Sequence, residues 1–223
     1  MIDFALARRN MVESQIRTND VTDRALVAAF LEIPRERFVP AAMRDLAYID
    51  EDITVKEGDR PGERRFLMEP MPFARLVQLA AIQPGDLVLD VGCGTGYSTA
   101  VLARVAESVV GLESDPDLAE KAERQLVDLG IGNAAVVTGD LVEGYASQGP
   151  YDVIVMEGAV ERIPDALFAQ LRDGGRLVAP VVHGPVGKAT LFTSIGGDIS
   201  SRIAFDVNVG RLPGFERTPE FVF

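Results

Sequence analysis

The stretch LVLDVGCGTGYSTAVLA, residues 87–103, combines an apolar run, an acid and three glycines at alternate positions. The acid is Asp90, and the glycines are Gly92, Gly94 and Gly96. Glycine adopts positive φ at little steric cost and lets a ligand approach the backbone closely. Beyond Gly96 the apolar residues take up helical spacing. The pattern therefore predicts a buried strand, a tight turn that binds a ligand, and a helix.

Two kinds of ligand compete for this turn. A dinucleotide fingerprint has the spacing G-x-G-x-x-G, followed by an acid about 20 residues further on. Here Tyr97 stands where the third glycine would be. The observed D-V-G-C-G-T-G strongly resembles the S-adenosylmethionine (SAM) loop of class I methyltransferases. The resemblance implies that Asp90 lies near the polar amino-acid end of SAM, and that Cys93 and Tyr97 belong to the binding turn together with the three glycines.

Acids also close the next two expected strands. Glu113 ends SVVGLE (108–113), and Asp140 ends the strand that follows. On the SAM interpretation, Glu113 accepts hydrogen bonds from both ribose hydroxyls, with Ser114 beside it. Asp140 is then suited to accept the adenine amino group, and Leu141 to pack near the ring. The carboxyl ends of parallel strands share one edge of a sheet, where ligands bind. The simpler alternative is that Glu113 and Asp140 only cap the following helices.

Strands and helices alternate from about Pro72 onward. Strands are expected at 87–91, 108–113, 134–140, 151–158 and 176–182, and helices at 72–82, 96–106, 116–130 and 163–175. Continuous apolar strands separated by helices indicate a parallel sheet covered on both faces. Three further strands, at 189–195, 201–210 and 220–223, are expected in the tail without helices between them. The predicted fold class is therefore α/β: a doubly wound, mostly parallel, Rossmann-like sheet with a strand-rich C-terminus.

The sequence before this sheet has a different character. Residues 1–71 are expected to form a helical segment with a substrate-side loop, and residues 72–223 a SAM-binding domain that is one compact unit. A helix after Thr22, which could cap it, is followed by a long irregular stretch. That stretch ends in the basic run RPGERR (60–65), for which a solvated loop is favoured over a nucleic-acid patch.

Composition excludes several classes of function. The formal net charge of −12 argues against a broad nucleic-acid surface. Cys93 is the only cysteine and His183 the only histidine, which argues against a disulfide framework, a multi-histidine metal centre and a histidine-based triad. His183 is interpreted as an ordinary loop residue. No apolar run approaches the roughly 18 residues that a membrane span needs, and no signal core is present, so a cytoplasmic location without membrane partners is expected.

The resemblance to a known family extends over nearly the whole chain. MVESQIR, VTDRALVAAFLEIPRERFVP, LAYIDEDI, VLDVGCGTGYSTAVLA, GDLVEGY, YDVIVMEGA and LPGF are similar to segments of protein-L-isoaspartate O-methyltransferases. The resemblance implies methyl transfer from SAM to the abnormal carboxylate of an isoaspartyl protein, whose ester collapses to a succinimide that can reopen as aspartate. A carboxylate is already ionised at neutral pH, so this transfer needs positioning and no general base.

One segment departs from the family. Where the family has Thr-Ile-Ser-x-Pro, which touches substrate and cofactor, this chain has Phe66, Leu67, Met68, Glu69 and Pro70. Phe66, Met68 and Pro70 are accordingly expected on the substrate side, where two hydroxyls are lost and Glu69 adds a negative charge. Three interpretations stay open: an isoaspartyl methyltransferase, a SAM-dependent methyltransferase of the same fold with another acceptor such as a small molecule, or a SAM-binding protein without catalysis.

Overall fold

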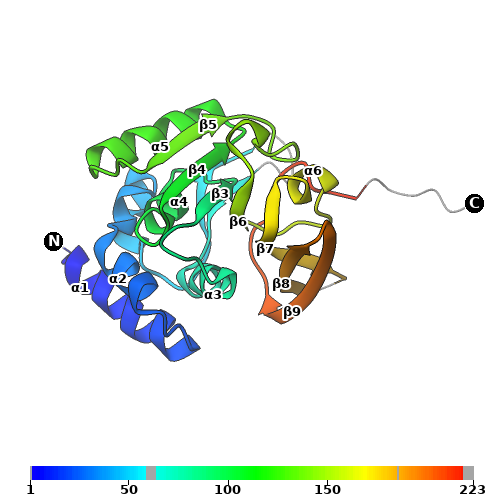
Figure 1. The fold of residues 1–223 in the computed structure, drawn as a ribbon. Coiled ribbons are helices and arrows are strands. Elements are labelled where there is room, and N and C mark those ends of the chain that lie inside the picture. The colour runs from blue at the N-terminus through cyan, green and yellow to red at the C-terminus, as the bar shows by residue number, and fades with distance from the viewer. Residues whose placement is uncertain (1, 59–63, 185, 218–223) are drawn as a thin grey trace, which may run out of the picture.

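A seven-stranded sheet runs through the molecule (Figure 1) in the computed structural model, which describes residues 2–58, 64–184 and 186–217. The strands are β3 (Leu87–Val91), β4 (Ser108–Glu113), β5 (Ala134–Thr138), β6 (Tyr151–Met156), β7 (Leu171–His183), β8 (Val186–Ile195) and β9 (Asp198–Val207). Their order is β5-β4-β3-β6-β7-β8-β9, and the first five are parallel while β8 and β9 pair antiparallel. The prediction of a mostly parallel α/β sheet with a strand-rich end is confirmed.

Helices flank this sheet (Figure 1). They are α1 (Phe4–Met11), α2 (Arg24–Glu32), α3 (Pro70–Ala80), α4 (Tyr97–Leu102), α5 (Pro116–Asp128) and α6 (Asp165–Phe168). Because successive strand residues point to opposite faces, Val88 and Leu89 belong to different core clusters. The cluster of Val88 includes buried residues from α1 to α5, and that of Leu89 includes Leu167 of α6 and Leu212. Both faces of the central strands are therefore buried.

The core cluster that contains Val88 is the larger of the two. It joins residues of the N-terminal segment, such as Phe30 and Met68, to sheet residues such as Val153. The expected division into 1–71 and 72–223 stays a prediction. At the start of α2 the cap is Asp23, whose carboxylate accepts from the backbone N–H groups of Ala25 and Leu26. The expected cap at Thr22 is therefore wrong by one residue, since aspartate fills this role at least as well as threonine.

A small ribbon interrupts the stretch that was expected to be irregular. Strands β1 (Ile53–Lys56) and β2 (Arg65–Leu67) pair antiparallel, with Ile53 opposite Leu67. The expected helix at 163–175 is also shorter than predicted, because Leu171 already pairs with Tyr151 of β6 and begins β7. The strand expected at 220–223 lies outside the described residues.

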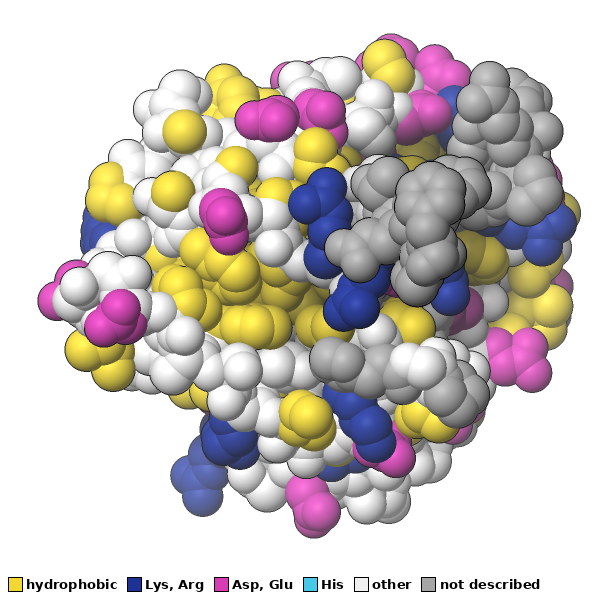
Figure 2. Space-filling model, turned by 90° about the vertical axis from the view of Figure 1, so that its right-hand side faces the viewer, with side chains coloured by type: hydrophobic (Ala, Val, Ile, Leu, Met, Phe, Trp, Pro, Cys, Tyr) yellow, Lys and Arg dark blue, Asp and Glu magenta, His cyan; other side chains and the backbone are white. Residues whose placement is uncertain are grey.

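Strand β9 forms one edge of the sheet, and most of its side chains are exposed. Ile199 and Ile203 are among the exposed large hydrophobic residues of the chain, as is Ile195 at the end of β8. Figure 2, which views the molecule from the right-hand side of Figure 1, shows hydrophobic side chains gathered on this part of the surface. Part of the apolar exposure of the chain therefore lies at the antiparallel end of the sheet; other exposed hydrophobic residues, such as Val127 of α5, lie elsewhere.

Candidate active site at the carboxyl edge of the sheet

Asp90 lies near the end of β3, between Gly111 of β4 and Val155 of β6, and is fully buried. Its Oδ2 accepts hydrogen bonds from Ser98 Oγ at 2.7 Å and Thr99 Oγ1 at 2.6 Å. Its Oδ1 is buried and has no hydrogen-bond partner among the described residues. Burial raises the pKa of Asp90 to about 7, although the two hydroxyls oppose that shift. A buried oxygen without a donor is the site at which a bound ligand can supply one.

Glu113 ends β4 and is also fully buried. Its carboxylate accepts from the backbone N–H groups of Gly94 at 2.8 Å, Ser114 at 2.8 Å and Asp115 at 3.0 Å. The Arg65 guanidinium forms a two-pronged ion pair with the same carboxylate. The cap of α5 is Asp115, not Glu113. The helix-cap alternative therefore fails for Glu113, which instead ties the glycine turn to the end of β4.

Asp140 and Leu141 follow β5 in a different environment. Asp140 is exposed, and its Oδ1 accepts from the backbone N–H of Val142 at 3.1 Å, which is a local turn contact. Leu141 is buried in the smaller core cluster. No described helix begins directly after Asp140, so the helix-cap alternative fails there too. Its contact with adenine stays a prediction.

The three glycines of the turn differ in what surrounds them, although all have positive φ. A Cβ at Gly96 would lie 2.9 Å from the Cβ of Ala122, and one at Gly92 would lie 2.5 Å from Leu212 Cδ2. A Cβ at Gly94 would meet no atom within 4 Å. Protein packing therefore accounts for Gly92 and Gly96, and Gly94 is the position open to a ligand.

A pair of alanine substitutions tests this distinction. We expect Gly94→Ala to cost only about 1–2 kcal/mol of stability, from the unfavourable φ, while weakening binding of S-adenosylhomocysteine (SAH) at least about tenfold. Gly96→Ala should cost more stability, because the new methyl overlaps α5. Urea unfolding and titration calorimetry measure the two effects. Wild-type affinity in Gly94→Ala would show that no ligand approaches the turn there.

Two predicted residues of the turn point into the protein. The Tyr97 ring is buried against Phe30, Phe38 and Phe73, with ring centroids 5.4–6.4 Å apart. Cys93 is buried, and burial raises the pKa of its thiol well above the usual range. The Tyr97 side chain is therefore a core residue, because Phe30, Phe38 and Phe73 surround it. The expected place of Tyr97 in the cofactor turn stays a prediction.

The substrate-side segment is likewise more buried than expected. Met68 belongs to the larger core cluster, and Pro70 occupies the first turn of α3. Phe66 is half-buried and covers Gly210 so closely that a Cβ there would lie 2.2 Å from the ring. The Met68 side chain therefore belongs to the core, and its expected place on the substrate side stays a prediction.

Sequence reasoning missed Arg35 and Glu157. Arg35 is fully buried, donates from Nε to the Ala47 carbonyl at 2.8 Å and from Nη2 to the Met68 carbonyl at 2.7 Å, and lies over the Tyr97 ring. Glu157 follows β6, and its buried Oε1 has no partner among the described residues. Burial, then the charge of Asp90, raises the pKa of Glu157 well above its usual range. Glu157 could have been found by its position, because it directly follows β6 and Glu113 is the last residue of β4.

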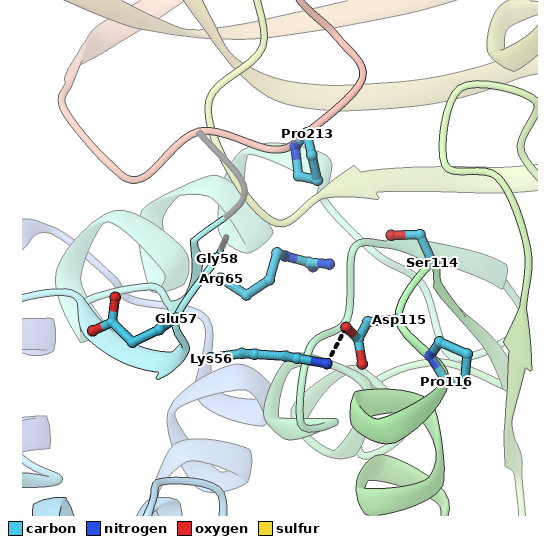
Figure 3. A pocket seen from close by; sticks show the side chains of 8 residues that line it. All are labelled: Lys56, Glu57, Gly58, Arg65, Ser114, Asp115, Pro116 and Pro213. Atoms are coloured by element: carbon cyan, nitrogen blue, oxygen red, sulfur yellow. Dashed lines mark hydrogen bonds and ion pairs between the residues drawn. The ribbon is translucent and has the colours of Figure 1, made fainter. Parts of the chain in front are cut away.

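A pocket of about 360 Å³ opens beside Glu113. Figure 3 shows Lys56 and Arg65 from the β1–β2 ribbon facing Ser114 and Asp115 across it, with Pro213 above. Lys56 forms an ion pair with Asp115. The pocket therefore adjoins the end of β4, where the ribose of SAM is expected. Three features fit the polar groups of SAM: the Oδ1 of Asp90, which has no partner among the described residues, the unfilled space beside Gly94, and Ser114, which lines the pocket.

Residues 2–58, 64–184 and 186–217 contain neither a membrane-spanning helix nor a metal-binding cluster. None of the helices in those ranges is both long and apolar enough to cross a membrane. Across the same residues, no group of three or more histidine, cysteine, aspartate or glutamate side chains is arranged to hold a metal ion.

Comparisons with known proteins identify the family of this chain. The profile of the family Protein-L-isoaspartate(D-aspartate) O-methyltransferase (PCMT) matches residues 7–205. The protein-L-isoaspartate O-methyltransferase of Koribacter versatilis is 41% identical over 178 residues, covering 80% of this chain and 78% of the relative. Protein-L-isoaspartate O-methyltransferase 2 of Anaeromyxobacter sp. is 38% identical over 188 residues, or 84% of this chain and 74% of the relative.

Solved structures show the same architecture. A protein-L-isoaspartate O-methyltransferase structure superposes with a TM-score of 0.82 at 28% identity, covering 93% of this chain and 66% of that chain. A Plasmodium falciparum structure in complex with SAH has a TM-score of 0.74 at 20% identity, covering 95% of this chain and 99% of that chain. The prediction of a SAM-dependent methyltransferase is confirmed. This chain belongs to the protein-L-isoaspartate O-methyltransferase family.

Proposed function

We propose that this chain methylates isoaspartyl carboxylates of proteins at the carboxyl edge of β3, β4 and β6. The observation that carries the proposal is a family match over residues 7–205 that includes two buried strand-end carboxylates, Asp90 and Glu113, beside the open Gly94. When bound, SAM supplies an electrophilic methyl group on its sulfur. Asp90 Oδ1 would accept from its amino group, and Glu113 from its ribose hydroxyls.

The remaining work of the chain is positioning. An isoaspartyl carboxylate is ionised at neutral pH, so it attacks without losing a proton. Arg35 holds the carbonyl of Met68, and Asp52 accepts from the backbone N–H groups of Glu69 at 2.8 Å and Gly210 at 2.6 Å. These contacts fix the segment 66–70 and the chain near 210 relative to one another. These hydrogen bonds align the acceptor with the methyl group. Alignment of this kind needs no histidine base, and the chain has only one histidine.

The direct test is methyl transfer to an isoaspartyl peptide. We expect a base-labile methyl ester on that peptide, and none on the matched peptide with normal aspartate. Both peptides carry the same charge, so the comparison isolates the geometry of the carboxylate. Transfer to neither peptide, with SAH bound normally, would contradict the proposal and leave the fold and cofactor assignments intact.

A second candidate acceptor is a hydroxyl or amine of a small molecule, and Glu69 favours it. Burial, then the charges of Asp52 and Asp50, raises the pKa of Glu69 to about 7. A carboxylate with that pKa is matched to general-base catalysis near neutral pH. This acceptor would need to lose a proton, whereas an isoaspartyl carboxylate would not.

The pH dependence separates the two candidates. Glu69 is neutral below about pH 7 and anionic above it. With an isoaspartyl acceptor and saturating SAM, we expect KM to rise from pH 6 to 8 through like-charge repulsion, and kcat to stay flat. Glu69→Gln should abolish the rise in KM, because glutamine carries no charge. A kcat that climbs through pH 7 and is lost in Glu69→Gln would instead support the hydroxyl or amine acceptor.

A further inference from the structure

The ion pair between Arg65 and Glu113 joins two distant parts of the chain. Arg65 comes from β2 and Glu113 from the end of β4, and both side chains are almost completely buried. Arg65 Nη2 donates to Glu113 at 2.8 Å and to the carbonyl of Gly92 at 3.0 Å. A guanidinium matches a carboxylate in this two-pronged geometry better than any other side chain does.

The hydrogen bonds to Glu113 leave no room for further donors. Oε1 accepts from the N–H groups of Ser114 and Asp115 and from Arg65, and Oε2 accepts from Gly94 and Arg65. A carboxylate has about four acceptor positions. Glu113 is therefore saturated while Arg65 stays in place. Two ribose hydroxyls can bind this carboxylate only if the guanidinium leaves. Three of the remaining donors are backbone groups that form the site, and the fourth, the Ser114 hydroxyl, makes only a long contact of 3.4 Å.

We propose that Arg65 competes with the ribose of the cofactor for Glu113, so that the β1–β2 ribbon must release Glu113 before the cofactor binds fully. The proposal rests on the ribose-binding role of Glu113 in the proposed function. The released guanidinium remains at the wall of the adjoining pocket, which Asp115 and Glu57 also line (Figure 3). Asp115 already pairs with Lys56 and Glu57 with Arg64, so the released cation joins these existing pairs at the pocket wall.

The consequence is a lowered apparent affinity for the cofactor. When only a fraction of the molecules is competent, the apparent Kd rises by the inverse of that fraction. Arg65→Met removes the guanidinium and keeps a side chain of similar length, while the three backbone donors still hold Glu113. We therefore expect Arg65→Met to bind SAH about tenfold more tightly than the wild type.

The control is Arg64→Met, which removes the same charge one residue earlier. Arg64 is exposed and pairs with the exposed Glu57, so its loss should leave SAH affinity within about twofold of the wild type. Calorimetry of both variants gives the comparison. Unchanged or weaker SAH binding in Arg65→Met would overturn the proposal, because it would mean that Arg65 stays on Glu113 or assists the ribose.

A measurement on the wild type covers the case in which Arg65→Met folds poorly. We expect SAH to speed amide hydrogen exchange in Ile53–Lys56 and Arg65–Leu67, while slowing it in 90–97. Slower exchange in both regions would overturn the proposal. SAH binding needs no methyl acceptor, so these outcomes are independent of whether the isoaspartyl peptide is methylated.

Discussion

Glu113→Gln is expected to lower the free energy of unfolding by about 3–5 kcal/mol, because it leaves the buried Arg65 guanidinium without its counter-charge. The substitution preserves the shape of the side chain, so packing changes little. It also places an NH₂ group against backbone N–H groups or the guanidinium, none of which can accept a hydrogen bond. The chain has no tryptophan, so urea unfolding is best followed by far-ultraviolet circular dichroism.

The same variant should weaken SAH binding more than about tenfold, since the ribose loses a charged acceptor. Glu57→Gln is the matched control, because its partner Arg64 is exposed and such pairs contribute about 0–1 kcal/mol. The double variant Glu113→Gln/Arg65→Met should recover much of the stability without recovering SAH binding. If Glu113→Gln alone were as stable as Glu57→Gln, the ion pair between Arg65 and Glu113 would not form in solution.

The sheet could be predicted from sequence because its signals are local. The apolar runs 87–91 and 108–113 carry an acid at the position before the last (Asp90) or at the last position (Glu113), and both became parallel strands with those bounds. The placement of Asp90 and Glu113 at one edge followed from the rule that the strand ends of such a sheet lie together; their complete burial was not predicted. Here local pattern and tertiary structure agree, as expected for a repeated strand–helix unit.

The role of Arg65 could not be predicted in this way. The run RPGERR is polar and rich in turn-forming residues, which is typical of a solvated loop. Arg64 fits that expectation, and Arg65 does not, because β2 turns successive side chains in opposite directions. Only the pairing of β1 with β2 determines which arginine is buried, and that pairing joins short strands with no strong sequence signal.

Side-chain direction could not be predicted at Tyr97 and Met68 either. Both residues lie in segments that adjoin the candidate site, yet both side chains pack into the larger core cluster. A motif match fixes the backbone position of a residue and says little about the face on which its side chain lies. Tyr97 is drawn inward by Phe38 and Phe73, which come from segments far apart in the sequence.

Arg35→Ala is expected to lower the free energy of unfolding by about 3–6 kcal/mol, an effect as large as that of Glu113→Gln. Two buried carbonyls, of Ala47 and Met68, lose their donors, at about 1–3 kcal/mol each. The contact over the Tyr97 ring, at 5.0 Å, adds to that loss. Arg35→Lys should recover little, because one ammonium cannot reproduce the fork of a guanidinium that reaches both carbonyls.

Arg35→Ala should change the KM for the peptide and not the SAH affinity, whereas Glu113→Gln should weaken SAH binding. Release of the Met68 carbonyl frees the segment 66–70, so the KM for an isoaspartyl peptide should rise in whatever fraction stays folded. SAH affinity should hold, because Gly94 and Glu113 are fixed by separate hydrogen bonds. Arg37→Ala is the control: its exposed pair with Asp128 should contribute no more than about 1 kcal/mol. If Arg35→Ala were as stable as Arg37→Ala, the buried guanidinium would not support the substrate-side segment, and the position of Met68 would need another cause.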